Sequence, residues 1–383
     1  MPDITLSSAV RNNLNALQST SQMMSGVQER LATGKKVNSA LDNPNSFFTA
    51  QGLQNRASDL GNLLDDMGQS VQTLKAADQG ITAISDLVDA AKAKANQAQQ
   101  TSSQSERKDF AAEYNELLTQ IEDLAKDAGY QGKNLLGGTG NDLSVTFNED
   151  GTSTLAISAV DYTDTTSSTG LNLSDLATAA NGSTTLALTS GSGTAALTGG
   201  ANIVDDLDFA AGDVLTLSDS TGTELGTLTL TASTTVTEVA TFIGGTNSDV
   251  SAAVGATGID VTTSIDLSLS STGALTTTAF NAGTSNGFAT DANIDATLSA
   301  LTKAQDTLRA QASTFGTNLS IVENRQDFTR SLINTLEEGA GKLTLADTNE
   351  EGANLLALQT QQSLASTSLS LAAQADQNVL RLF

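Results

Sequence analysis

Apolar residues near the start of the chain recur with the spacing of one helix face. Steps of three, four and seven residues predict an amphipathic helix over residues 4–33. Gly34 suits the end of this helix, and Lys35 and Lys36 complement the negative end of its dipole. Asn43-Pro44 then interrupts the pattern, because a residue before proline avoids the helical conformation. The stripe consists of Val10, Leu14, Leu17, Met24, Val27 and Leu31.

Two longer heptad repeats cover residues 53–95 and 294–336. Sustained heptads are typical of coiled coils, and fifty helical residues make a rod of about 75 Å. We expect the two rods to pair antiparallel within one chain, and Gly339 and Gly341 to end the second rod. The predicted rod core contains Leu60, Met67, Leu74, Ile81, Leu301, Leu308, Phe315 and Val322.

The last segment, residues 353–383, carries an apolar face too wide for one helical neighbour. A single pair of terminal helices would bury a few leucines, each contributing about 1.5–3 kcal/mol, against an ordering entropy of about 1–2 kcal/mol per residue. We therefore predict that both terminal segments are mobile in the monomer and pack between copies. The predicted self-assembly contacts are Val10, Leu14, Leu17, Met24, Leu31, Leu358, Leu364, Leu369, Leu371, Val379 and Leu382.

The middle of the chain changes from helical to strand-like patterns. Ser103 and Glu106 have capping-box spacing before a helix that ends at Gly129 and forms a helical hairpin with the first rod. Leu143–Phe147 and Ser153–Ser158 predict a β-hairpin. Beyond it, Thr/Val/Leu runs alternate with Gly-rich turns, and Thr234 is a candidate cap for a short helix. The predicted elements there are strands at Thr184–Leu188, Val214–Leu217, Leu225–Thr231 and Ile259–Ser264, and a helix at Val236–Ile243.

These patterns predict a mainly α fold with an inserted β-rich (α+β) domain. Residues 1–43 and 344–383 are the expected terminal helices, residues 44–173 and 289–343 the helical rods with the β-hairpin, and residues 174–288 the inserted domain. The insert contains no basic residue, since none occurs between Lys133 and Lys303.

The composition argues against several classes of function. The chain has 383 residues, a net charge of −25, and neither His nor Cys. The acidic balance argues against nucleic-acid binding, and the missing residues remove imidazole and thiolate metal sites and Ser/His or Cys nucleophile chemistry. We expect no membrane insertion, because apolar runs are too short, and no general secretory signal peptide is visible.

The remaining candidate chemistry is weak. Asp291-Ala292-Asn293-Ile294-Asp295 begins like a calcium loop but has Ala296 where the loop needs glycine. The Asp205-Asp206-Asp208 cluster leaves weak calcium capture open. Paired carboxylates elsewhere lack the aromatic residues of a sugar cleft. We expect no enzyme activity and no cofactor.

The flanks resemble the ends of bacterial flagellin. The N-terminal match includes Asn12–Asn15, Glu29–Asp42 and Leu74–Ile81, and the C-terminal match includes Ala346-Asp347, Leu364-Ala365 and Ala373–Phe383. The stretch Asp42–Phe48, which reads DNPNSFF, is similar to the alphaproteobacterial branch. The resemblance covers roughly residues 1–173 and 290–383.

The resemblance implies a subunit of the extracellular flagellar filament, which serves swimming. Terminal helices would line the inner wall of a helical tube of identical copies, and the insert would project outward. Implied partners are the cap and hook-junction proteins and the type III export apparatus with its chaperone, through which the chain passes unfolded. Two alternatives stay open: a hook–filament junction protein, and a secreted adhesin or hydrolase carried by the insert.

Overall fold

The computed structural model describes residues 8–191 and 195–380, and these residues fall into two compact units. The first unit contains residues up to Gly68, the hairpin tip 146–154 and residues from Glu323 onward. The second contains residues 69–145 and 155–322. Two long helices, α2 (Pro44–Gln100) and α5 (Asp291–Thr344), contribute to both units. Among the described residues, no helix is long and apolar enough to cross a membrane.

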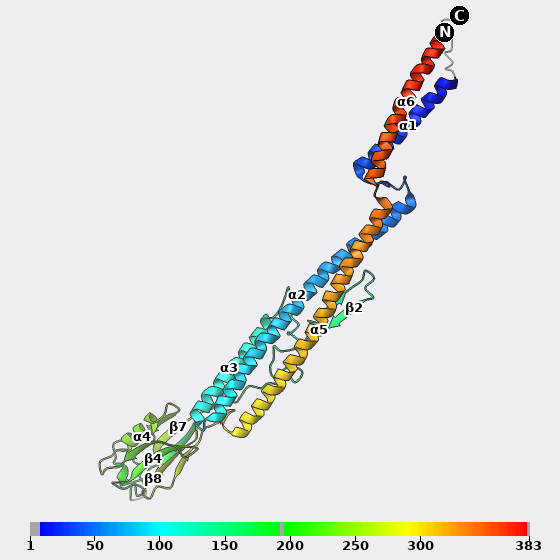
Figure 1. Ribbon diagram of the computed structural model, residues 1–383. Coiled ribbons are helices and arrows are strands. Elements are labelled where there is room, and N and C mark those ends of the chain that lie inside the picture. The colour runs from blue at the N-terminus through cyan, green and yellow to red at the C-terminus, as the bar shows by residue number, and fades with distance from the viewer. Residues whose placement is uncertain (1–7, 192–194, 381–383) are drawn as a thin grey trace. The chain divides into compact units, whose positions relative to one another are not determined.

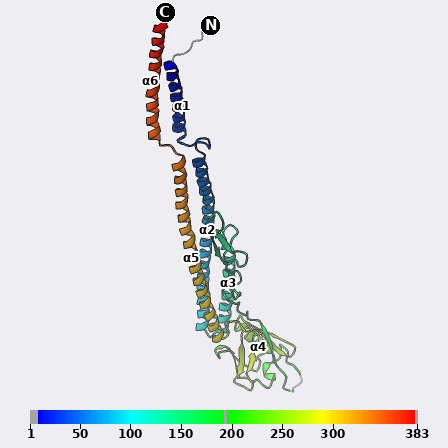
Figure 2. The same cartoon turned by 90° about the vertical axis from the view of Figure 1, so that its right-hand side faces the viewer.

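The terminal helices of the first unit are α1 (Ser8–Thr33) and α6 (Thr348–Leu380), which lie side by side in both views of the ribbon (Figures 1 and 2). Gly34 follows α1 with a φ of +68°, the left-handed conformation expected of a glycine cap. Pro44 is the first residue of α2, where its missing N–H costs nothing. The predicted mobility of these segments in the monomer stays a prediction, which slow amide exchange at Leu14 or Leu369 would contradict.

The prediction that Gly339 and Gly341 end the second rod is wrong. Helix α5 continues through both glycines to Thr344, whose hydroxyl donates to the Ala340 carbonyl at 2.9 Å. Ala340 is almost fully buried, and packing of this turn outweighs the cost of about 1 kcal/mol that a glycine adds within a helix. Helical structure is interrupted instead at residues 345–347, between α5 and α6. There the Asp347 carboxylate accepts the Asn349 N–H at 2.9 Å and caps α6.

The second unit places α3 (Gln104–Asp127) after the tight turn that follows α2. Ser103 caps α3 as predicted, by accepting the Glu106 N–H at 3.4 Å. The reciprocal half of the predicted capping box is absent from α3, because the Glu106 carboxylate accepts the Thr101 hydroxyl instead. Strands β1 (Leu143–Thr146) and β2 (Thr154–Ile157) form the predicted hairpin.

The described residues of the insert form two antiparallel sheets. The first has the order β3-β7-β6, formed by Gly182–Ala187, Gly258–Thr263 and Val250–Val254. The second has the order β5-β4-β8-β9, formed by Glu224–Thr229, Val214–Asp219, Leu267–Ser271 and Thr278–Phe280. The short 3₁₀ helix η1 covers Ile203–Asp205, and helix α4 (Val236–Gly245) packs on β6 and β7. One apolar core, which includes Leu217, Val239 and Ile259, joins both sheets to α4.

Thr235, and not the predicted Thr234, caps α4. Thr235 and Glu238 form a complete capping box, in which the Thr235 hydroxyl accepts the Glu238 N–H at 3.2 Å and the Glu238 carboxylate accepts the Thr235 N–H at 2.7 Å. The Thr234 hydroxyl is used one turn earlier, where it accepts the Thr231 N–H at 2.8 Å.

A two-stranded stem joins the insert to the rods. Ala180 donates its N–H to the Thr284 carbonyl at 3.1 Å and accepts the Gly283 N–H at 2.9 Å. The Asn115 side chain on α3 exchanges two hydrogen bonds with the Leu176 backbone, at 2.8 and 2.9 Å. The two ends of the insert therefore meet at one place on α3.

Candidate assembly surface

Helices α1 and α6 form an antiparallel pair with a regular seam. Asn13 donates to the Ser368 hydroxyl at 3.2 Å, and Arg30 contacts the Glu351 carboxylate at 3.0 Å, so position increases along one helix as it decreases along the other. Buried and half-buried positions recur every three or four residues, as in a coiled coil. The seam positions are 10, 13, 17, 20, 24, 27 and 31 on α1 and 351, 355, 358, 362, 365, 369 and 372 on α6.

The structure divides the predicted self-assembly residues into two groups. Val10, Leu17, Met24, Leu31, Leu358 and Leu369 lie on the seam between the two helices. Leu14, Leu364 and Leu371 are exposed, the last two by 66% and 63%. The Val379 side chain and Leu382 lie outside the part of the chain whose side chains are described.

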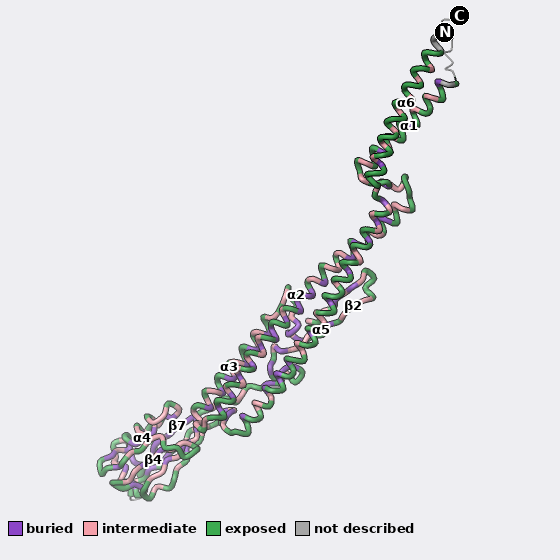
Figure 3. Tube along the Cα trace, in the orientation of Figure 1, coloured by how far each residue is buried: buried purple, intermediate pink, exposed green. Residues whose placement is uncertain are grey.

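A leucine stripe remains on the outer side of α6. Leu356, Leu364 and Leu371 are exposed by 63–70% and follow steps of eight and seven residues, so they share one helix face. We call these residues the outer leucine stripe. Sequence reasoning missed Leu356, which adjoins the seam residue Leu355. The sequence showed a wide apolar face, but it did not show which leucines lie on the seam and which are exposed. Figure 3 shows how much of α1 and α6 is exposed.

The predicted rod residues are all buried. Leu60, Met67, Leu74, Ile81, Leu301, Leu308, Phe315 and Val322 are each exposed by 2% or less. In the first unit, Leu60 packs with Ala57 and Leu336. In the second unit, α2 and α5 are joined by polar contacts that include Lys92 to Gln305 at 3.2 Å and Gln99 to Asp295 at 2.8 Å.

The connectors between terminal helices and rods are paired with each other. Lys36 and Val37 donate their N–H groups to the Thr344 carbonyl at 2.8 and 3.3 Å, and Ala346 donates to the Gly34 carbonyl at 3.0 Å. We call this two-stranded segment the joint. These three backbone hydrogen bonds hold the two connectors together.

Sequence reasoning missed Arg107, a buried cation located where α2 ends and α5 begins. Its guanidinium donates to the carbonyls of Ala98 and Thr101 at 3.0 and 2.8 Å, to the Ala289 carbonyl at 3.3 Å, and to the Asp291 carboxylate at 2.6 Å. The available signal was a basic residue in the first turn of α3, where a positive charge opposes the helix dipole.

A second missed cluster fastens the insert to α3. Asp249 accepts hydrogen bonds from Lys108 and Ser105, and the Ser264 hydroxyl donates to it at 3.2 Å. Burial raises the pKa of the Asp249 carboxyl, but the hydrogen bonds and the charge of Lys108 outweigh it, so the net pKa is lowered. Gln104 and Asp266 exchange two further hydrogen bonds, at 2.6 and 3.1 Å.

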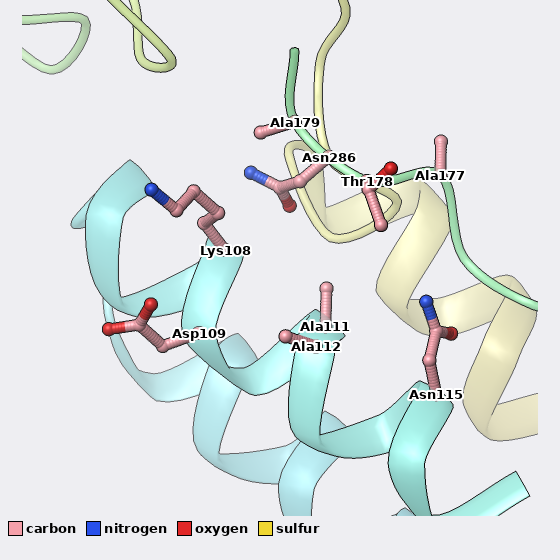
Figure 4. Close-up of a pocket in the computed structure, with 9 residues that line it drawn as sticks. All are labelled: Lys108, Asp109, Ala111, Ala112, Asn115, Ala177, Thr178, Ala179 and Asn286. Atoms are coloured by element: carbon pink, nitrogen blue, oxygen red, sulfur yellow. The ribbon is translucent and has the colours of Figure 1, made fainter. Parts of the chain in front are cut away.

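The same junction contains a small cavity of about 140 Å³. Figure 4 shows Lys108, Ala111, Ala112 and Asn115 of α3 facing the stem residues Ala177–Ala179 and Asn286. Lys108 is already engaged by Asp249, so this cavity is a packing gap of the stem.

In the Asp205-Asp206-Asp208 cluster, Asp206 forms hydrogen bonds with the nearby backbone. Asp206 accepts the N–H groups of Thr189 and Asp208, at 2.6 and 2.9 Å. Within residues 8–191 and 195–380, no group of three or more acidic side chains is arranged to hold a metal ion.

Comparisons with known proteins match both helical ends of the chain to one family. The chain matches the bacterial flagellin N-terminal helical region over residues 4–141 and the bacterial flagellin C-terminal helical region over residues 298–383. Flagellin A of Rhizobium meliloti is 26% identical over 403 residues, with both chains covered completely. Flagellin FljO of Caulobacter vibrioides is 28% identical over 218 residues, which is 53% of this chain and 80% of the relative.

Among solved structures, FlgL of Xanthomonas campestris aligns with a TM-score of 0.35 and 16% identity, over 75% of this chain and 97% of that chain. The two family regions together span more than half of the 383 residues. The chain therefore belongs to the bacterial flagellin family, in its alphaproteobacterial form, and is a structural subunit of the flagellar filament.

Proposed function

We propose that the chain polymerises through the α1–α6 pair, with the outer leucine stripe packed against neighbouring copies. The exposure of Leu356, Leu364 and Leu371 carries this proposal. Burying one such leucine contributes about 1.5–3 kcal/mol, so a stripe repeated in every subunit supplies a large driving force for assembly. A soluble monomer gains nothing from such a stripe.

In this proposal, the parts of the chain have separate roles. Residues 1–43 and 344–383 form the inner core of the filament, residues 44–173 and 289–343 form the surrounding rods, and residues 174–288 form the outer domain. The filament is extracellular and serves swimming. The chain reaches the growing tip unfolded through the type III export apparatus and contacts the cap and hook-junction proteins there. A chain without disulfides suits this route.

Electron microscopy of purified protein at rising concentration tests the proposal. We expect long filaments from the unaltered chain and none after removal of residues 1–43. Replacing Leu364 and Leu371 together by serine should abolish filaments without changing monomer melting, since both side chains are exposed. Leu207→Ser is the matched control, because Leu207 is 79% exposed but belongs to the insert. Short structures that stop growing would indicate a junction protein instead.

A further inference from the structure

Helix α1 carries two adjacent methionines in different surroundings. Met23 is 49% exposed and lines an open groove of about 720 Å³ between α1 and α6. Met24 is half-buried on the seam between the same two helices. Met67, in α2, is completely buried. The three thioether side chains therefore differ in their access to a reagent dissolved in water.

Methionine is the side chain of this protein that is most open to oxidation by peroxides. The sequence contains four methionines and no cysteine, tryptophan or histidine to compete for the oxidant. Hydrogen peroxide transfers one oxygen atom to the thioether, so that the O–O bond breaks, an S–O bond forms, the sulfur loses two electrons and water leaves. The product, methionine sulfoxide, is polar, whereas methionine is a flexible apolar side chain.

Burial sets both the order of oxidation and its effect. Met23 is reached through the groove, which is open beside it, since a Cβ added at Gly26 would meet nothing within 4 Å. A sulfoxide oxygen on Met23 can turn to solvent, because half of the residue is already exposed. Oxidation at Met23 therefore has little effect on the α1–α6 pair.

Met24 is different, because its side chain lies between the two helices. Arg30 contacts Glu351, and in the antiparallel pair Met24, about two turns earlier, comes to the level of the seam residue Leu358. A sulfoxide oxygen placed on this seam loses water without gaining a hydrogen bond, which is unfavourable. Oxidation of Met24 therefore weakens the α1–α6 pair.

We propose that Met23 and Met24 form an oxidation site that controls the α1–α6 pair. Hydrogen peroxide oxidises Met23 first, without separating the helices, and then Met24, whose sulfoxide separates them. Met67 does not react while the rods are folded. An oxidised subunit then fails to join the filament; this last step rests on the proposed polymerisation, whereas the oxidation and its effect on the pair do not. A methionine sulfoxide reductase reverses the change, because its dithiol removes the oxygen as water.

Mass spectrometry of the full chain during a graded hydrogen peroxide treatment tests the order of reaction. We expect sulfoxide to appear several-fold faster at Met23 than at Met24, and at Met67 only after unfolding in urea. Met67 is thus a control within the same molecule. Equal rates at Met23 and Met24, or reaction of Met67 in the folded chain, would overturn the assignment of the site.

Nitroxide labels measure the effect on the pair without any need for polymerisation. They are attached at the exposed positions Ser21→Cys and Ser363→Cys, in a chain that has no cysteine of its own. After peroxide treatment, the ratio of close to separated label pairs should fall about tenfold in the otherwise unaltered chain and in Met23→Leu. It should not change in Met24→Leu, because leucine fills a similar volume and cannot be oxidised. An equal fall in Met24→Leu contradicts the role of Met24.

Filament growth tests the last step. Peroxide should raise the critical concentration of the unaltered chain about tenfold, a methionine sulfoxide reductase should restore it, and Met24→Leu should resist the treatment. Separated labels together with normal growth would overturn the link to polymerisation and leave the oxidation site in place. Failure of the untreated chain to form filaments would instead refute the proposed function, and the label and mass measurements would still decide the oxidation site.

Discussion

Arg107 shows how one side chain can hold three segments together. Its guanidinium joins the end of α2, the turn before α3 and the beginning of α5, and only 8% of the residue is exposed. A lysine has the same charge but presents all its donors from one atom, so it cannot reach the same set of acceptors.

We predict that Arg107→Lys lowers the free energy of unfolding by about 2 kcal/mol and that Arg107→Ala lowers it by about 3–4 kcal/mol. Urea unfolding followed by circular dichroism measures both. Arg309→Lys is the control, since that arginine pairs with Asp306 on an exposed helix face and should change stability by less than about 0.5 kcal/mol. Equal stability of Arg107→Lys and the unaltered chain would contradict the role assigned to the guanidinium.

The Lys108–Asp249 contact predicts a pH dependence. Because the pKa of Asp249 is lowered in the folded chain, its stabilising effect is complete above its ordinary value of 3.8 and is lost as the pH falls through the lowered value. Asp249→Asn should therefore reduce stability by about 1–3 kcal/mol near neutral pH, since the side chain is only 8% exposed. Unfolding of both proteins near pH 6 and pH 2.5 should show the difference shrinking in acid. A difference that persists undiminished would exclude ionisation of Asp249 as its cause.

At the scale of elements, Gly80 explains how α2 and α3 approach each other. A Cβ atom at this position would lie 2.7 Å from the Ala128 Cβ and 2.8 Å from the Leu136 Cδ1. We predict that Gly80→Ala destabilises the chain by about 1–3 kcal/mol, although alanine is the better helix former. Gly61→Ala in the same helix meets nothing within 4 Å and should stabilise by up to about 1 kcal/mol. Thermal melting of the two variants should shift in opposite directions; a shared upward shift would mean that the close contact relaxes freely.

The sequence predicted individual helices, caps and hairpins better than it predicted contacts between them. Heptads predicted both rods, and local signals placed the Gly34 cap and the β-hairpin, because these depend on residues near each other in the chain. Gly339 and Gly341 misled the prediction, since the burial of Ala340 that keeps α5 helical depends on tertiary packing. The acceptors of Arg107 include Asp291, 184 positions away, and the strand order of the insert likewise depends on contacts that no local pattern encodes.

At the scale of the whole molecule, the stem makes the insert separable. Ala180 and Thr284 are bridged by backbone hydrogen bonds, so a short Asn-Gly turn can join them after residues 181–283 are removed. We predict that the shortened chain unfolds cooperatively and still forms filaments, and that residues 180–284 alone fold around their own core.

Calorimetry and electron microscopy test this separation. The control removes residues 174–288 instead, which deletes Leu176 and leaves the Asn115 side chain without its two backbone partners. This longer deletion should lower the melting temperature of the rods. If the shorter deletion is equally harmful, the insert is part of the folding unit of the rods rather than an addition to it.

The joint has a consequence for the timing of folding during synthesis. Its strands come from opposite ends of the chain, and the Arg30–Glu351 pair beside it joins residues separated by 321 positions. Neither contact can form until almost the whole polypeptide has been made, because each joins residues near the two ends of the chain. The α1–α6 pair therefore forms only in a complete subunit. A chain that ends before residue 344 lacks α6 and cannot form the pair.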